Sequence, residues 1–273
     1  MKGLRTARWI LAGLFFVMSA VYLAFGRQLL RFASLSEKSQ IIPSAITVSI
    51  GAVLFWLVIS FVYGRLYCST VCPVGTLIDL SSKLRRLMPA RRRRYRYRNR
   101  HKVRFHIATV YFVCLIAGIS VVPALIEPWN VFRNIIGTAN PASSAAAAVN
   151  LGIGAATGIV AGAVSLLLIV FAAVFTGREF CNTVCPVGTV LGLMGSNSVY
   201  RVEIDPDKCT GCLECEEACP AGCVKVVGRF VDDARCVRCM ECVARCPENA
   251  IRYQPGRNRV ATPMMRGVKP HGR

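Results

Sequence analysis

Two cysteine runs with the same spacing lie near the C-terminus of the chain. Both read C-x-x-C-x-x-C-x-x-x-C-P, one over residues 209–220 and the other over residues 236–247. This spacing is typical of segments that bind cubane [4Fe–4S] clusters, which need four thiolates each. In such a pair, the first three cysteines of a run bind one cluster and the fourth binds the other. The runs therefore predict a small domain that is built around two cubanes.

The crossed pattern sorts eight cysteines into two ligand sets. Cluster site 1 comprises Cys209, Cys212, Cys215 and Cys246. Cluster site 2 comprises Cys236, Cys239, Cys242 and Cys219. Structural zinc sites or a disulfide framework would also use cysteines, but tandem runs that each close with Cys-Pro favour clusters. Two neighbouring clusters indicate a protein that transfers electrons.

The rest of the chain is both apolar and basic. The 273 residues carry a net charge of +20 and have a positive mean hydropathy. Ten of the fourteen acidic residues lie within residues 203–248, so the remainder is strongly basic. A soluble protein this basic is rarely this apolar, and the combination predicts a membrane protein with its charge in loops.

Four apolar stretches, each near the ~20 residues that cross a bilayer as a helix, predict four transmembrane spans. They cover residues 9–25, 41–63, 105–126 and 149–176. None contains Asp, Glu, Lys or Arg, which argues against an ion pump with a proton relay. A cleaved signal peptide over the first stretch is a weaker alternative, because no A-x-A site follows it.

The predicted fold is an all-α membrane four-helix bundle of two related helix pairs, followed by a small α+β two-cluster ferredoxin domain. The predicted boundaries are 1–197 for the bundle, 198–254 for the ferredoxin domain and 255–273 for a basic disordered tail. Basic residues cluster at the N-terminus and in the Arg-rich run 91–98. The positive-inside rule then places both termini in the cytoplasm, as expected for a multi-pass protein of the bacterial inner membrane.

Tyrosines alternate with arginines in the run 91–98, as in some nucleic-acid-binding segments. Because the run lies between two predicted spans, contact with anionic lipid headgroups is the preferred interpretation, and no nucleic-acid partner is expected.

Histidine is scarce, and among His101, His106 and His271 only His106 lies inside a span, which argues against a haem. Glu127 follows the third span, where it could accept a proton from a quinol.

A repeated sequence, here called the repeat motif, follows the second and fourth spans. Residues 64–76 read GRLYCSTVCPVGT and residues 177–189 read GREFCNTVCPVGT. In a helix the two cysteines of C-x-x-x-C share one face, and the proline that follows should end or redirect the turn. If the copies pack together, four thiols converge at the cytoplasmic membrane surface. We call these the motif cysteines: Cys68, Cys72, Cys181 and Cys185.

Four converging thiols suit a third iron–sulfur cluster or zinc. The alternatives are a reversible dithiol pair, thiols that bind copper transiently, or a purely structural role. Arg65 and Arg178 precede the first cysteine of each copy by one turn, where a guanidinium could stabilise thiolates or an anionic cluster. Of the remaining cysteines, Cys223 is expected to be a small buried residue beside a cluster, and Cys114 an apolar residue in the middle of the third span.

Four spans, a repeated R-x-x-C-x-x-x-C-P-x-G and two C-terminal cluster runs resemble the NapH-type membrane ferredoxins and the C-terminal half of NosR-type proteins. The resemblance covers nearly the whole chain, to about Tyr253. It implies an electron-transfer subunit of a quinol dehydrogenase in anaerobic respiration, with no catalytic residues beyond the cysteines. Its partners would be the quinone pool, membrane lipid, and redox proteins of the ferredoxin or multihaem cytochrome type in a respiratory reductase system. The alternative is an assembly, maturation or redox-sensing factor that uses cluster electrons to reduce a metal or thiols of a client protein.

Overall fold

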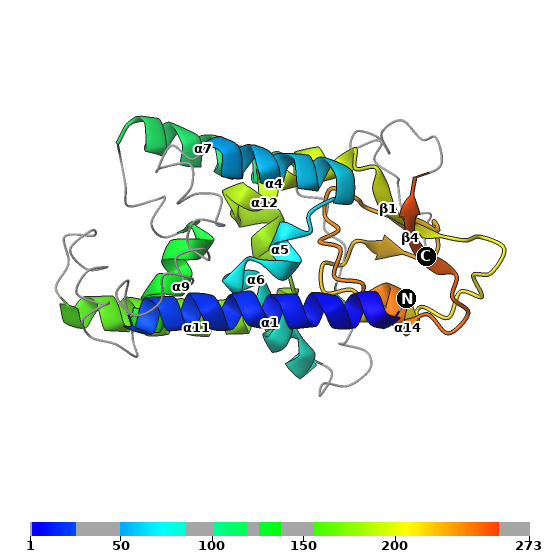
Figure 1. Ribbon diagram of the computed structural model, residues 1–273, viewed down its shortest axis with the longest axis horizontal. Helices are drawn as coiled ribbons and strands as arrows, with labels where there is room; N and C mark the ends of the chain where they lie inside the picture. Colours follow the sequence, from blue (N-terminus) through cyan, green and yellow to red (C-terminus); the bar gives the residue numbers. More distant parts are fainter. Residues whose placement is uncertain are drawn as a thin grey trace.

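A computed structural model describes residues 2–25, 50–85, 95, 101–118, 126–137 and 155–256 of the chain. Figure 1 shows a helical region with a small α+β domain at one end, beside the N-terminus of the first helix. The expectations for the Arg-rich run other than Tyr95, for His271 and for the tail beyond residue 256 lie outside the described residues. So do parts of the second, third and fourth predicted spans.

Within the described ranges, the helical region contains four long helices with apolar sequences. They are α1 (Lys2–Phe25), α4 (Ile50–Tyr63), α7 (His101–Ile116) and α11 (Ala155–Thr176). Among the described residues, one helix is long and apolar enough to cross a bilayer, and its apolar part is Gly3–Leu23. The apolar segments Gly51–Tyr63 and Ala163–Thr176 are shorter. The helical character of this region is confirmed, whereas the four-span bundle stays a prediction.

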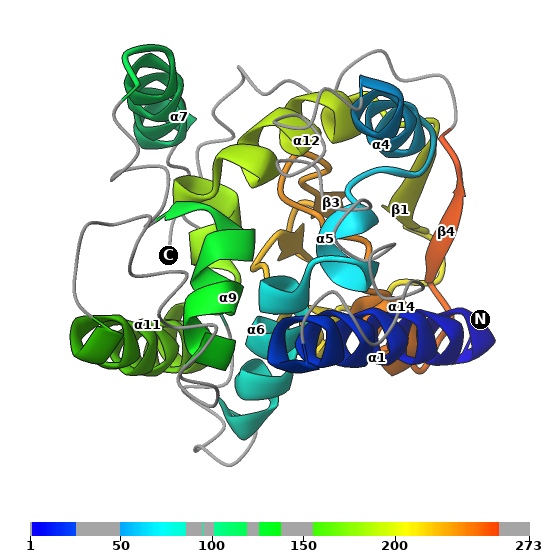
Figure 2. The same cartoon turned by 60° about the vertical axis from the view of Figure 1, so that its left-hand side comes forward.

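Shorter elements fill the space among the long helices. They are α5 (Tyr67–Thr70), α6 (Pro73–Leu84), α9 (Pro128–Gly137), the π-helix η3 (Phe180–Val184) and α12 (Pro186–Ser196). Figure 2 shows α5 and α9 between α12 and the pair α1 and α11, with α6 next to α1, and α1 contacts α5, α6 and α9. The main apolar core lies here, and it includes the motif cysteines.

The C-terminal domain has the duplicated arrangement that its two cysteine runs predict. The strands β1 (Tyr200–Ile204) and β4 (Ile251–Pro255) pair antiparallel, and so do β2 (Val224–Lys225) and β3 (Phe230–Val231). The short helices α13 (Glu214–Ala218) and α14 (Glu241–Arg245) each begin within a run and end before its Cys-Pro. Each run thus forms one loop and one helical turn, which positions its three leading cysteines.

Candidate iron–sulfur sites

The structure brings the four cysteines of cluster site 1 together. All of them line one cavity between the loop of the first run and the end of α14. Cys246 comes from the second run, so this cavity combines cysteines of both runs. Burial raises the pKa of Cys215 to about 12, and the nearby Cys212 and Cys246 add to this effect.

The cysteines of cluster site 2 are buried and also come together. Cys219, Cys236 and Cys242 pack in the apolar core of the ferredoxin domain, and Cys239 belongs to the adjoining core of the helical region. Each of the four thiols is no more than 7% exposed. A further thiol, Cys223, lies beside this site with its Sγ 3.5 Å from the Sγ of Cys219. The expectation that Cys223 is a small buried residue next to the ligands agrees with this position.

The two copies of the repeat motif fold in the same way. Each preceding helix ends at a glycine with a left-handed backbone, Gly64 (φ +78°) or Gly177 (φ +66°), a conformation that glycine adopts without steric cost. The second cysteine of each copy is extended, and the proline after it opens a new helix. Proline suits the first helical position because its missing N–H has no partner there. The two cysteines of a copy therefore lie on either side of a helix break, rather than on one face of a continuous helix.

The four motif cysteines meet where the two copies face each other. All are 5% or 6% exposed and share one apolar core. Within the described part of the chain, no three His, Cys, Asp or Glu side chains form a group that would bind a single metal ion.

The arginines of the repeat motif bind across the two copies. Arg65 donates from Nη2 to the carbonyl oxygen of Cys181 at 3.0 Å. Arg178 donates from Nη1 to the carbonyl oxygen of Cys68 at 2.9 Å. Both arginine side chains are fully buried. Each copy thus orders the cysteine loop of the other, which explains why the arginine recurs at the same distance before the first cysteine.

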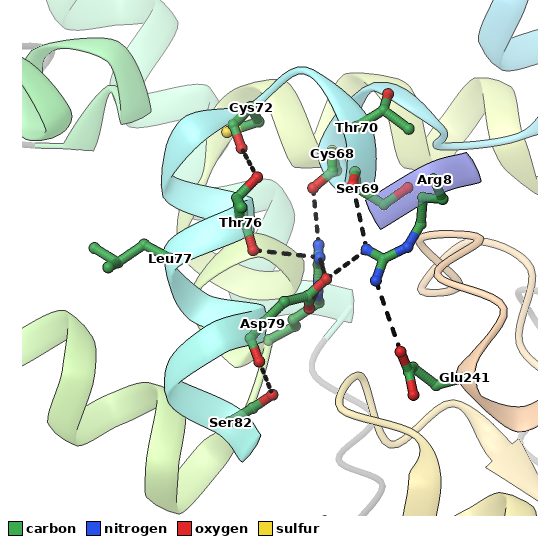
Figure 3. Close-up of polar contacts among 12 residues, drawn as sticks. Arg8, Cys68, Ser69, Thr70, Cys72, Thr76, Leu77, Asp79, Ser82 and Glu241 are labelled. Atoms are coloured by element: carbon green, nitrogen blue, oxygen red, sulfur yellow. Dashed lines mark hydrogen bonds and ion pairs between the residues drawn. The ribbon is translucent and has the colours of Figure 1, made fainter. Parts of the chain in front are cut away.

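A buried carboxylate, Asp79, joins the motif to the first helix. Its Oδ1 accepts from Nε of Arg178 and its Oδ2 from Nη1 of Arg8, both at 2.7 Å. Figure 3 shows Arg8 between Asp79, the carbonyl oxygen of Ser69 and Glu241. Burial alone would raise the pKa of Asp79, but Arg178 and Arg8 outweigh it and lower the pKa below its usual range.

Sequence reasoning did not select Asp79 and Arg8 as site residues. A signal was available, because Asp79 is one of only four acidic residues outside the ferredoxin segment. An isolated acid in an apolar, basic region needs a buried partner. The partner could not be identified from the sequence, since Arg8 lies 71 positions away.

Positive charge surrounds the motif cysteines. The buried Arg65 has its Nη2 3.9 Å from the Sγ of Cys68, while its Nε lacks a hydrogen-bond partner. The amide Nδ2 of Asn182 is also buried without a partner. Arg104 donates from Nη2 to the carbonyl oxygen of Gly188 at 2.7 Å, and burial with nearby arginines lowers its pKa to about 9. These buried cations and donors fit an anionic group in the site.

The thiols themselves need such positive charge if they are to act as ligands. Burial raises the pKa of Cys181 to about 11, although Arg178 opposes this effect. Burial also raises the pKa of Cys72 and Cys185, and the other motif cysteines add to it. Thiolates at this depth are therefore stable only when a metal or cluster neutralises them. The donor set of four thiols among buried arginines fits an iron–sulfur cluster.

Cluster site 2 lies directly against the repeat motif. Cys239 belongs to the same apolar core as the motif cysteines. The backbone N–H of Arg178 donates to the carbonyl oxygen of Pro220 at 2.9 Å, next to the ligand Cys219. Arg65 donates from Nη1 to the carbonyl oxygen of Ala234 at 3.1 Å. The motif arginines therefore contact both the motif loops and the ferredoxin domain.

Two residues of α7 that were considered in the sequence have no part in these sites. His106 is exposed on this helix, and Cys114 is half-buried.

Glu127, just before α9, has an environment that predicts a pH-dependent stability. Its side chain is 4% exposed and accepts from Nδ2 of Asn130 at 2.7 Å. Burial raises its pKa to about 7, although Arg133 opposes the shift. The folded state therefore binds a proton more tightly than the unfolded state, and stability should fall as pH rises from about 5 to 7, by roughly 2 kcal/mol. Thermal unfolding in detergent between pH 5 and 8 should show this slope in the wild type and not in Glu127→Gln. Parallel pH profiles for the two proteins would contradict the assignment.

Two family models match the parts of the chain that contain these cysteines. A family model described as a 4Fe-4S binding domain matches residues 45–91 and 159–201, which contain the two copies of the repeat motif. A second model with the same description matches residues 202–225 and 229–252. No solved structure matches the chain.

The similar curated proteins include ferredoxin-type proteins. The ferredoxin-type protein NapH of Escherichia coli is 28% identical over 66% of this chain and 55% of its own length. The methylamine utilization ferredoxin-type protein MauN of Paracoccus denitrificans is 30% identical over 65% of this chain and 56% of its own. An uncharacterized protein of Methanocaldococcus jannaschii, MJ0749, is 26% identical over 81% of this chain and 76% of its own. The chain thus spans little more than half the length of NapH and MauN. With two matched 4Fe-4S domains and these relatives, it belongs to the NapH-type 4Fe-4S ferredoxin family.

Proposed function

We propose that this iron–sulfur electron-transfer protein is anchored in the cytoplasmic membrane and passes electrons between the quinone pool and a respiratory reductase system. The names of NapH and MauN describe ferredoxin-type proteins, in keeping with an electron-transfer role. The membrane anchor is supported by the outward faces of the long helices. They expose large apolar side chains such as Leu14 on α1, Phe55 on α4, Val113 on α7 and Leu168 on α11. Apolar faces on four helices of one molecule suit contact with lipid.

The observation that carries the proposal is the contact between the motif cysteines and cluster site 2. Iron–sulfur clusters, when bound, supply one-electron transfer, whereas a quinol releases two electrons and two protons. The motif cysteines would hold a third [4Fe–4S] cluster beside the ferredoxin domain. Arg65 and Arg178 keep positive charge at that position, and the surrounding core excludes water. This arrangement suits a chain of redox centres that begins at the membrane surface.

The iron content tests this function. We expect about twelve irons and about twelve acid-labile sulfides per chain in anaerobically purified protein, because each cubane contributes four of each. The double variant Cys68→Ser/Cys181→Ser should fall to about eight, whereas Cys114→Ser, which alters a cysteine outside the motif, should stay near twelve. About eight irons in the wild type would overturn the third cluster. Addition of duroquinol should reduce the clusters in the wild type but not in the double variant, and the same extent of reduction in both would rule out the motif as the entry point.

A further inference from the structure

The two cluster sites of the ferredoxin domain differ in their access to solvent. Every residue from 231 to 240, the segment that carries Cys236 and Cys239, is buried. In contrast, Cys212 of cluster site 1 is exposed, and Cys209 and Cys246 are half-buried. One site thus faces the helical region, and the other faces outward.

Specific contacts hold the buried segment against the helices. Arg235 forms an ion pair with Glu179 at 2.8 Å. Arg65, just after α4, donates from Nη1 to the carbonyl oxygen of Ala234 at 3.1 Å. Within the segment, Arg238 pairs with Asp233 at 2.7 Å, and it donates from Nη2 to Oγ of Ser198, just after α12, at 2.8 Å. These buried polar contacts leave no room for another protein at the loop of cluster site 2.

A second set of contacts closes the domain on the side of α1. Glu241 accepts from Nε of Arg5 and from Nε1 of Trp9, both at 3.0 Å. Glu241 follows the ligand Cys239 by two positions, so the first helix covers α14 at cluster site 2. The corresponding residue of the first run, Glu214, instead pairs with the exposed Arg245 at 2.8 Å. At the same position of the two runs, Glu241 therefore binds the first helix, whereas Glu214 lies at the solvent-facing surface.

We infer that a soluble one-electron redox protein docks on the surface around cluster site 1. This exit surface comprises residues 207–212 and 247–249, and its exposed members include Asp207, Lys208, Thr210, Glu248 and Asn249. The inference rests on the proposed electron-transfer function, because it makes cluster site 1 the last redox centre before the partner protein. Electron transfer requires close approach, and of the two ligand sets in the ferredoxin domain, this one has a cysteine at the surface.

The chemistry of the exit surface indicates the kind of partner. Its exposed side chains are mainly polar, with Asp207 and Glu248 of one sign and Lys208 of the other. Small polar contacts of this type are typical of transient redox encounters, which depend on charge for their association rate. The partner would therefore form a short-lived complex. For a basic partner, loss of an acidic residue on the exit surface should weaken the complex, and loss of the basic Lys208 should strengthen it.

The test uses cluster-loaded protein that dithionite has reduced, mixed with mitochondrial cytochrome c, a basic protein. Each reduced cluster gives one electron to one ferric haem. At low ionic strength, Glu248→Lys should slow the second-order reaction about fivefold, and Lys208→Glu should speed it up by a similar factor. Carbodiimide cross-linking should join cytochrome lysines to Asp207 or Glu248, as identified by mass spectrometry.

Arg252→Glu provides the matched control. Arg252 is exposed on β4, and it follows Ile251, which lines the cavity of cluster site 1. Because side chains alternate along a strand, Arg252 points to the opposite face. Its charge reversal should change the rate less than twofold. The inference is overturned if Arg252→Glu has an effect as large as Lys208→Glu, or if the cross-links lie outside the exit surface. Since dithionite supplies the electrons, a failure of quinol to reduce the protein would count against the proposed function alone.

Discussion

Replacement of Asp79 by asparagine is expected to destabilise the protein by about 3–5 kcal/mol, because the buried Arg178 loses its carboxylate partner and Arg8 keeps only the more distant Glu241, at 3.7 Å. Arg8 and Arg178 are 4% and 0% exposed, and both donate to this carboxylate at 2.7 Å. Asparagine keeps the size and one acceptor oxygen, so the loss is one of charge rather than of packing. For a chain of this length the midpoint of thermal unfolding should fall by roughly 10 °C.

The ion pair between Glu214 and Arg245 provides the control for Asp79→Asn. Its side chains are 41% and 57% exposed, and its N–O distance of 2.8 Å is close to that of the buried pairs. Solvent screens such a pair, and Glu214→Gln should cost less than about 1 kcal/mol. Thermal unfolding of both variants in the same detergent makes the comparison. An equal fall in the midpoint of thermal unfolding for the two variants would mean that Asp79 does not hold the repeat motif to α1.

The spacing of the cysteines allowed the grouping of the eight ferredoxin cysteines, because each run forms its own loop and helical turn. The ligand sets stay a prediction, and Cys246 shares a cavity with the three leading cysteines of the first run. The approach of the two repeat copies could also be predicted from their shared sequence. The sequence did not reveal that the arginines bind across the copies, because that contact depends on where each chain turns after Gly64 and Gly177.

The docking of the ferredoxin domain on the helices was not predicted for a related reason. Glu241 belongs to a cysteine run and Arg5 to the first helix, 236 positions earlier. No local pattern joins residues so far apart, and their pairing follows only from the packing of whole elements. The equal spacing of the two runs also gave no sign that their cysteines differ in solvent exposure. The second run is covered by the helical region, which the spacing within the run does not describe.

The glycine that ends the shared C-P-x-G of the repeat motif gives the second large expected effect. A Cβ on Gly75 would collide with the carbonyl oxygen of Cys68, and a Cβ on Gly188 with that of Cys181. These are the carbonyl oxygens that accept from Arg178 and Arg65. The backbone cannot move away without the loss of a buried hydrogen bond to a guanidinium, so Gly75→Ala and Gly188→Ala should each cost about 3 kcal/mol.

Gly13→Ala is the matched control, because Gly13 lies within α1 and has no atom within 4 Å of an added Cβ. Alanine favours the helix over glycine, so this variant should be unchanged or more stable by up to about 1 kcal/mol. If the two copies share one centre, Gly75→Ala and Gly188→Ala should also lower the iron content to the same value, about eight per chain. A loss of iron in one variant and not in the other would show that the copies act independently. If Gly75→Ala and Gly188→Ala were both as stable as Gly13→Ala, the close packing of the cysteine loops would be contradicted.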